Sequence, residues 1–95
     1  MLKYEIMILL TEKFNESQLK NWALNFAKKL QTLNAFEISV ISRGKRDLAY
    51  PIKNQKKGNF IQINFLSVPK YINLFSNQLK FDNNILRFLI INKKL

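Results

Sequence analysis

The segment that decides the fold is LKYEIMILL, residues 2–10. Successive side chains of an extended strand point to opposite faces, so the even-numbered residues from Tyr4 to Leu10 share one face, and Met7 and Leu9 share the other. Both faces are therefore apolar. This pattern is typical of a strand at the centre of a sheet, and we expect the chain to begin with such a strand.

Outward from this strand, the chain alternates between helical and extended patterns. Asn15 can cap a helix, because Gln18 follows three residues later as in a capping box, and apolar residues then recur at helical spacing from Leu19 to Leu33. Pro69 suits the first position of a second helix, since it has no N–H to leave unsatisfied. Two-residue alternation and turn-forming residues predict the other elements: a strand over 36–52, a polar turn over 53–59, a strand over 60–66 and a last strand over 85–91.

The expected element order is βαββαβ, the split βαβ or ferredoxin-like plan. Right-handed crossovers place both helices on one face of a four-stranded antiparallel sheet, so the fold class is α+β. A chain of 95 residues supplies one core, and we expect residues 1–95 to form a single domain. If Tyr4, Ile61 and Phe88 point towards the helices, the open face carries basic, amide and apolar side chains: Lys3, Met7, Phe60, Gln62, Asn64, Arg87 and Leu89.

The chain is strongly basic. Lys and Arg number 16 against 6 Asp and Glu, with no His, which gives a net charge of +10 at pH 7. Such a surplus opposes compaction through self-repulsion and is typical of proteins that bind a polyanion: RNA, DNA or an anionic membrane surface. The first apolar run, residues 6–10, is too short for a secretory signal or a membrane span, so we expect a soluble protein without a membrane partner.

The composition excludes most site chemistry. With no Cys and no His, the chain cannot form a disulfide, a Cys-ligated zinc or iron–sulfur site, a Cys nucleophile or a His general base. Two glycines do not suffice for a phosphate-binding P-loop or a dinucleotide fingerprint. The six carboxylates are spread along the chain without catalytic pairing. We therefore expect no enzyme activity, no catalytic residue, no metal, no cofactor and no small-molecule substrate.

The basic residues are concentrated in one segment. Residues 43–57 hold six bases and one acid, Asp47, at the end of the second strand and around the expected turn. A cationic field of this kind contacts phosphates, with an affinity that falls steeply as salt is added. The alternative interpretation is a solvated loop in a lysine-rich protein. Aromatic rings on such a sheet can stack on unpaired bases, and we expect Phe60 to be exposed for this role and Tyr4 to pack in the core.

A sequence signature lies within the basic segment. Residues 46–52, RDLAYPI, resemble the R-x-L-A-Y-P-I signature of the sixth protein of the bacterial-type small ribosomal subunit, a family found in bacteria and plastids. Two further segments agree in the same order, YEI at 4–6 and FDNNILR at 81–87. The resemblance implies the ferredoxin-like fold and a structural, non-enzymatic role. It implies binding to the central domain of small-subunit (16S-type) rRNA together with the eighteenth small-subunit protein, on the ribosome of a plastid stroma or a bacterial cytoplasm.

The resemblance also implies roles for particular residues. Arg46 and Arg87 match bases of the family pattern, while Tyr50 and Pro51 match residues that shape the end of the strand. Asp47 departs from the pattern, because many relatives have a base or a neutral polar residue there, and its carboxylate weakens the local positive field. Many relatives also continue into a charged C-terminal extension, and we expect any function of that extension to be absent here.

We therefore favour an RNA-binding structural protein of the ribosome. We expect phosphate contacts from seven bases: Lys3, Lys45, Arg46, Lys56, Lys57, Lys80 and Arg87. Phe60 is expected to contact the partner protein or a base. The alternative is a small ferredoxin-like ligand-sensing or regulatory module, which would bind its ligand at a helix–sheet or dimer interface and would not need a basic turn.

Overall fold

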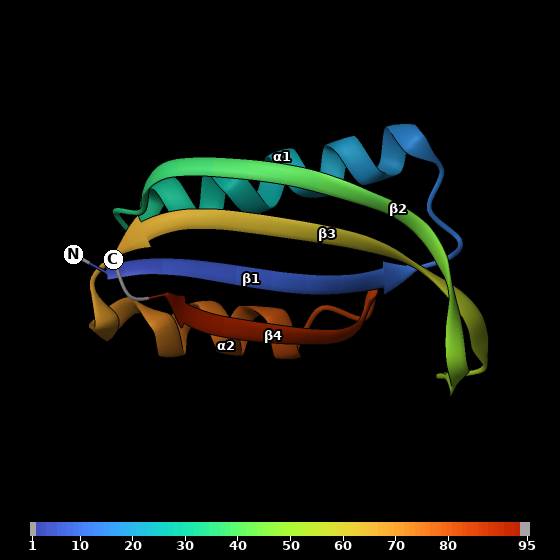
Figure 1. The fold of residues 1–95 in the computed structure, drawn as a ribbon. Helices are drawn as coiled ribbons and strands as arrows, with labels where there is room; N and C mark the ends of the chain where they lie inside the picture. The colour runs from blue at the N-terminus through green and yellow to red at the C-terminus, as the bar shows by residue number, and fades with distance from the viewer. Residues whose placement is uncertain (1, 94–95) are drawn as a thin grey trace.

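The computed structural model describes residues 2–93, so residues 1, 94 and 95 of the expected domain lie outside the described part (Figure 1). Its elements are, in chain order, β1 (Leu2–Thr11), α1 (Glu16–Thr32), β2 (Phe36–Ile52), β3 (Gln55–Ser67), the 3-10 helix η1 (Pro69–Tyr71), α2 (Ile72–Lys80) and β4 (Ile85–Lys93). The strands form one antiparallel sheet in the order β2-β3-β1-β4, and both helices cover the same face of it. The predicted ferredoxin-like α+β fold is confirmed.

β1 is a central strand, as its apolar pattern predicts. It pairs along its whole length with β3, from Leu2 opposite Ser67 to Thr11 opposite Gly58, and it pairs with β4 on its other side. The β1 side chains that face the helices are at most 5% exposed: Tyr4, Ile6, Ile8 and Leu10. β1 therefore lies at the centre of the core beneath both helices.

Local side-chain chemistry starts the first helix where the sequence predicts it. The Asn15 side chain accepts a hydrogen bond from the backbone N–H of Gln18 at 2.8 Å, and the Gln18 side chain accepts one from the N–H of Asn15 at 2.8 Å. α1 then buries Phe26 and Leu30 against the sheet, and α2 buries Phe75 and Leu79.

In the described residues, no helix has the length and apolar character needed to cross a membrane.

The hairpin between β2 and β3 is longer than the sequence predicts. The expected turn over 53–59 is wrong: the turn is only Lys53 and Asn54, with φ angles of 49° and 64°. Two central residues with positive φ match the right-handed twist of paired strands, so both strands continue to the tip. β3 begins at Gln55, because backbone pairing does not need the apolar alternation on which the prediction rested.

The far end of this hairpin bends across the sheet towards β4 (Figure 1). Its pairing is irregular between Asp47 and Ile52, where residues 48–51 leave the regular ladder. At the tip, Lys53 Nζ donates a hydrogen bond to the carbonyl oxygen of Ile85 at 3.1 Å. The signature segment is therefore the part of β2 that turns over the open face.

The sheet face away from the helices carries the side chains that alternation predicts, but it is not exposed throughout. Tyr4 and Ile61 are buried in the core and Phe88 packs partly against it, which places all three on the helix side as expected. On the opposite face, Leu9 and Gln62 are only 6% and 8% exposed. The bent hairpin lies over Leu9, while Gln62 belongs to a network of hydrogen bonds.

Candidate nucleic-acid interface

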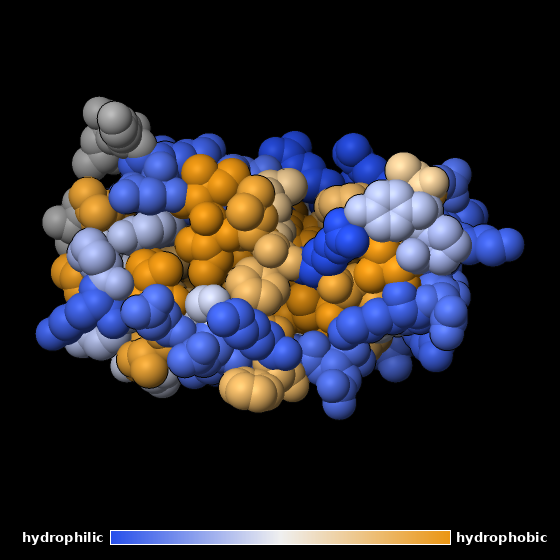
Figure 2. Space-filling model, turned by 90° about the horizontal axis from the view of Figure 1, so that it is seen from below, coloured by the Kyte–Doolittle hydropathy of each residue, from blue (hydrophilic) through white to orange (hydrophobic). Residues whose placement is uncertain are grey.

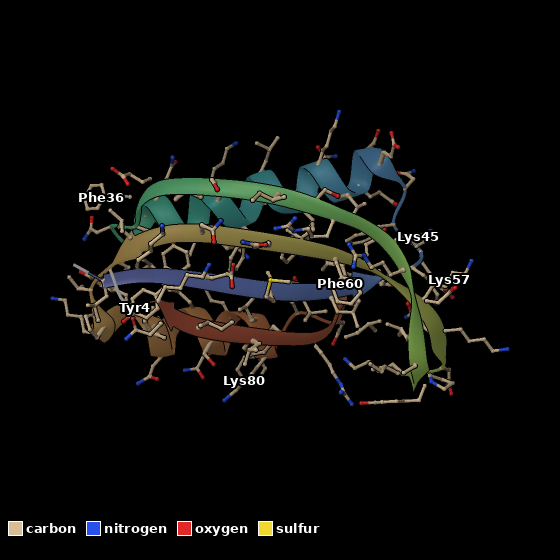
Figure 3. All side chains as sticks on the ribbon, viewed as in Figure 1. Tyr4, Phe36, Lys45, Lys57, Phe60 and Lys80 are labelled. Atoms are coloured by element: carbon tan, nitrogen blue, oxygen red, sulfur yellow. The ribbon has the colours of Figure 1, made fainter. Side chains whose placement is uncertain are left out.

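Strand pairing gathers the basic segment on the two arms of the hairpin. Lys45 lies opposite Asn59 and Asp47 lies opposite Lys57, so bases from β2 and β3 stand side by side. Figure 3 shows Lys45 and Lys57 together at the end of the molecule where the hairpin bends. The clustering expected from the sequence is present, but Lys56 and Lys57 belong to a paired strand and not to a loop.

Strand alternation divides these bases between two faces. Arg46 lies opposite Gly58 and its guanidinium carbon is 5.8 Å from the centre of the Phe60 ring, which places it on the open face. Lys56 shares that face with Phe60, because residues two and four apart on a strand point the same way. Lys45 points to the other side, where its Nζ donates to the carbonyl oxygen of Glu12 at 2.9 Å. The hairpin therefore presents positive charge on both sides.

The predicted phosphate-binding residues are all exposed, and the one ion pair that the structure gives them is weak. Lys57 Nζ lies 3.8 Å from Asp47 Oδ1, with side-chain exposures of 54% and 84%. An exposed pair of this kind contributes about 0–1 kcal/mol. An incoming phosphate can therefore replace the Asp47 carboxylate at Lys57 at little cost.

Arg87 is held by an aromatic residue of the signature. Its Nη1 donates to the Tyr50 hydroxyl at 2.7 Å, and its guanidinium carbon lies 5.2 Å from the centre of the Tyr50 ring. Tyr50 thus joins the bent end of β2 to β4, which is how it shapes the strand end. Beneath it is a hollow of about 350 Å³ with mainly apolar walls, including Met7, Leu9, Leu48, Ile52, Phe60 and Leu89.

The other two predicted bases lie in different places. Lys80, the last residue of α2, lines a hollow of about 330 Å³ together with Lys53 and Arg87 at the β4 edge, so it adds to the charge near Lys53 of the hairpin tip. Lys3 lies opposite Lys93 near the start of β1, at the end of the sheet away from the hairpin. The structure therefore brings six of the seven predicted residues towards one end and leaves Lys3 apart.

A polar network crosses the open face, and none of its members is among the predicted site residues. Arg43 donates from Nε and Nη2 to the side-chain oxygen of Gln62, whose amide nitrogen donates to Glu5. Lys93 Nζ is 3.1 Å from the same Glu5 oxygen. The signal in the sequence is the presence of Glu5 and Gln62 between apolar residues of two strands, but their connection depends on strand register.

A ferredoxin-like sheet with bases gathered on one hairpin is the architecture expected of a small nucleic-acid-binding protein. The family model for ribosomal protein S6 matches residues 3–92. The chain is 72% identical over 91 residues to small ribosomal subunit protein bS6c of Trieres chinensis, covering 96% of this chain and 95% of that protein. It is 33% identical over 90 residues to bS6 of Dictyoglomus turgidum, covering 95% and 93%.

A solved structure agrees in fold. The crystal structure of 30S ribosomal protein S6 from Thermotoga maritima matches with a TM-score of 0.89 at 21% identity, covering 97% of this chain and 87% of that one. The chain belongs to the ribosomal protein S6 family. This confirms the resemblance carried by RDLAYPI and gives the chain a structural role in the small ribosomal subunit. Plastid and bacterial relatives place it on the ribosome of a plastid or a bacterium, in a family of structural proteins not known as enzymes.

Proposed function

We propose that this chain, as a single ferredoxin-like domain without catalytic activity, binds the central domain of small-subunit rRNA. The proposed phosphate contacts at the hairpin end come from Lys45, Arg46, Lys56, Lys57, Lys80 and Arg87, and Lys3 makes a separate contact. The observation that carries this proposal is the hairpin itself, in which the segment 43–57 sets six bases against one carboxylate on paired strands.

The arrangement of charge indicates how RNA meets the hairpin. Bases on both sides of a thin two-stranded ribbon favour a position between two phosphate backbones, with Arg46 and Lys56 towards one and Lys45 and Lys57 towards the other. Each phosphate that is neutralised releases condensed counterions, which adds about 0.7–0.9 to the slope of log affinity against log salt. The affinity of such a site therefore falls steeply with ionic strength.

We further propose that the eighteenth small-subunit protein completes the site. The family resemblance names this partner, and two surfaces of this chain suit a protein. The first is the mainly apolar hollow beneath the bent hairpin, and Figure 2 shows apolar surface bordered by hydrophilic residues on the underside of the molecule. The second is the edge strand β2, where Phe36 is 50% exposed and an added strand can pair. Phe60 is half-buried and not fully exposed as the sequence predicts; it lines the hollow and would contact the partner or a base.

A salt titration tests the hairpin directly. Binding of a central-domain rRNA transcript, with the partner protein present, is measured at several salt concentrations for the wild type and for Lys56→Ala/Lys57→Ala. We expect the slope of log affinity against log salt to fall by about 1–2 in the double variant, because two phosphate contacts are removed. The matched control is Lys28→Ala/Lys29→Ala, which removes two exposed lysines from α1 on the helix side. An unchanged slope in the first variant would remove these lysines from the site.

Sedimentation separates this proposal from the ligand-sensing alternative. A tagged chain in cell lysate should migrate with small ribosomal subunits and leave them as salt is raised. A chain that instead migrates as a free dimer at low salt would support the sensing module and contradict the proposal.

A further inference from the structure

A second hollow lies on the open face, where β1, β2 and β3 run side by side. It measures about 410 Å³ and is lined by Met7, Arg43, Arg46, Phe60 and Gln62. This volume is within the range of about 300–1,000 Å³ that small-ligand sites occupy. Two guanidinium groups and an aromatic ring therefore share one concave surface, which suits a ligand with an anionic group beside a flat ring.

A bulge in β2 brings Arg43 and Arg46 to the same face of the sheet. Ser42 lies opposite Ile61 and Gly44 lies opposite Phe60, so Arg43 is the extra residue between two successive ladder positions. Gly44 has a φ of 88°, in the left-handed region that residues with a side chain rarely adopt. Ile41 lies opposite Gln62, so strand alternation alone places Arg43 on the open face, where it contacts Gln62. The extra residue shifts the alternation by one position and puts Arg46 on that face as well.

Gln62 fixes the orientation of the Arg43 guanidinium. Its side-chain oxygen accepts from Arg43 Nε at 3.2 Å and from Nη2 at 2.6 Å, and its amide nitrogen donates to Glu5. Both Gln62 and Glu5 are only 8% exposed, so this support is built into the sheet. Gln62 therefore occupies one edge of the Arg43 guanidinium. Within residues 2–93 the Nη1 group of Arg43 makes no hydrogen bond.

The nearby negative charge is already paired elsewhere. Lys93 Nζ lies 3.1 Å from Glu5, and the Gln62 amide separates Glu5 from Arg43. Arg46 donates from Nε to the Arg43 carbonyl oxygen at 3.3 Å, which brings the two residues together. In the described part of the chain, neither arginine forms an ion pair. Two neighbouring cations without a counterion make a strong anion site.

We propose that this hollow binds one unpaired nucleotide of the RNA, with its phosphate between Arg43 and Arg46 and its base against the ring of Phe60. The inference rests on the proposed function, since it assigns a position on the same RNA. Guanidinium groups bind phosphate through paired N–H donors, and aromatic side chains stack on bases of any sequence. The ring beside the two cations is the reason for assigning a nucleotide, because an acidic peptide would use the arginines without needing Phe60.

NMR can observe the site directly, because the chain has only three arginines, Arg43, Arg46 and Arg87. The side-chain Nε–Hε signals and the Phe60 ring are followed in the full chain during titration with a uridine hexanucleotide and, separately, with inorganic phosphate. We expect the hexanucleotide to shift Arg43, Arg46 and Phe60, and phosphate alone to shift only the two arginines. Affinities are then compared for Arg43→Gln, Arg43→Lys, Phe60→Leu and the exposed-charge control Lys28→Gln.

The four variants distinguish binding at this hollow from non-specific attraction of RNA to positive charge. Arg43→Gln should weaken hexanucleotide binding about tenfold, because a charge-assisted contact is lost. Arg43→Lys should lose most of the same factor, since it keeps the charge but not the planar fork. Phe60→Leu should weaken binding about fivefold or more through lost stacking. Lys28→Gln should change it by less than about twofold.

Each outcome has a distinct meaning. The inference is overturned if the arginine signals do not shift when the hexanucleotide is added, while the chain still binds the central-domain transcript with its full salt slope. The proposed function then still stands. Signals that respond only to the partner protein also overturn it, because the hollow would then be a protein contact. A wild-type chain that binds neither RNA, with or without the partner, refutes the proposed function as well.

Discussion

Replacing Gly44 by Ala tests whether the β-bulge at residues 43 and 44 depends on the positive φ angle of Gly44. A Cβ atom at position 44 would meet no other atom within 4 Å, so the substitution creates no clash. The φ of 88° is the only obstacle, and a left-handed conformation costs an L-residue about 1–2 kcal/mol. In a domain of this size about 1 kcal/mol corresponds to about 4–8 °C in Tm, so we expect the Tm to fall by at least about 4 °C.

The assay is urea and thermal unfolding of the wild type, Gly44→Ala and Gly44→Asn. Asn adopts positive φ more readily than Ala, so the Asn variant should lose less of the free energy of unfolding. The Nε–Hε signal of Arg43 should also move in the Ala variant, because the bulge relaxes. An Ala variant as stable as the wild type, or an Asn variant less stable than Ala, would refute the conformational argument.

Other predictions concern stability and are checked by urea unfolding. Gly58→Ala should lose about 1–3 kcal/mol by overpacking, because its Cβ would press on the Leu9 side chain, in contrast to Gly44 where space is open. Asn15→Ala should lose about 1 kcal/mol, and adding Gln18→Ala should cost little more, since the capping box acts as a unit. Leu30→Ala should lose about 2–5 kcal/mol, because the Leu30 side chain of α1 is fully buried against the sheet. A loss below about 0.5 kcal/mol in any of the three single variants would contradict the packing or capping described for it.

The sequence predicts those parts of the fold that depend on local chemistry. The double-sided apolar pattern of 2–10 places β1 at the centre, and Asn15 with Gln18 marks the start of α1, because each signal acts within a few residues. The tip of the hairpin is different. Residues 55–59 have no apolar alternation, yet they pair with β2 through backbone hydrogen bonds that any residue but proline can make.

The same distinction applies to the candidate site. The clustering of Arg46 with Lys56 could be predicted, because a hairpin brings near neighbours in sequence together. Strand alternation predicts that Lys45 points away from Arg46, but which of the two lies on the open face depends on register. The link from Arg43 through Gln62 to Glu5 joins three strands and depends on their register. The placement of Arg46 beside Arg43 depends on the bulge at Gly44, which a single sequence shows only as an isolated glycine. Contacts of this kind need the register, which side-chain patterns do not supply.

The unequal strand lengths have a mechanical consequence. β2 and β3 have 17 and 13 residues against 10 and 9 in β1 and β4, so the hairpin projects past the four-stranded body. In the projecting part each strand is flanked on one side only, and such segments open locally at a lower free energy than the core. The ribbon can therefore change its curvature at a lower cost in free energy than the four-stranded body. A folding RNA could adjust the curvature of the ribbon without disturbing the helices.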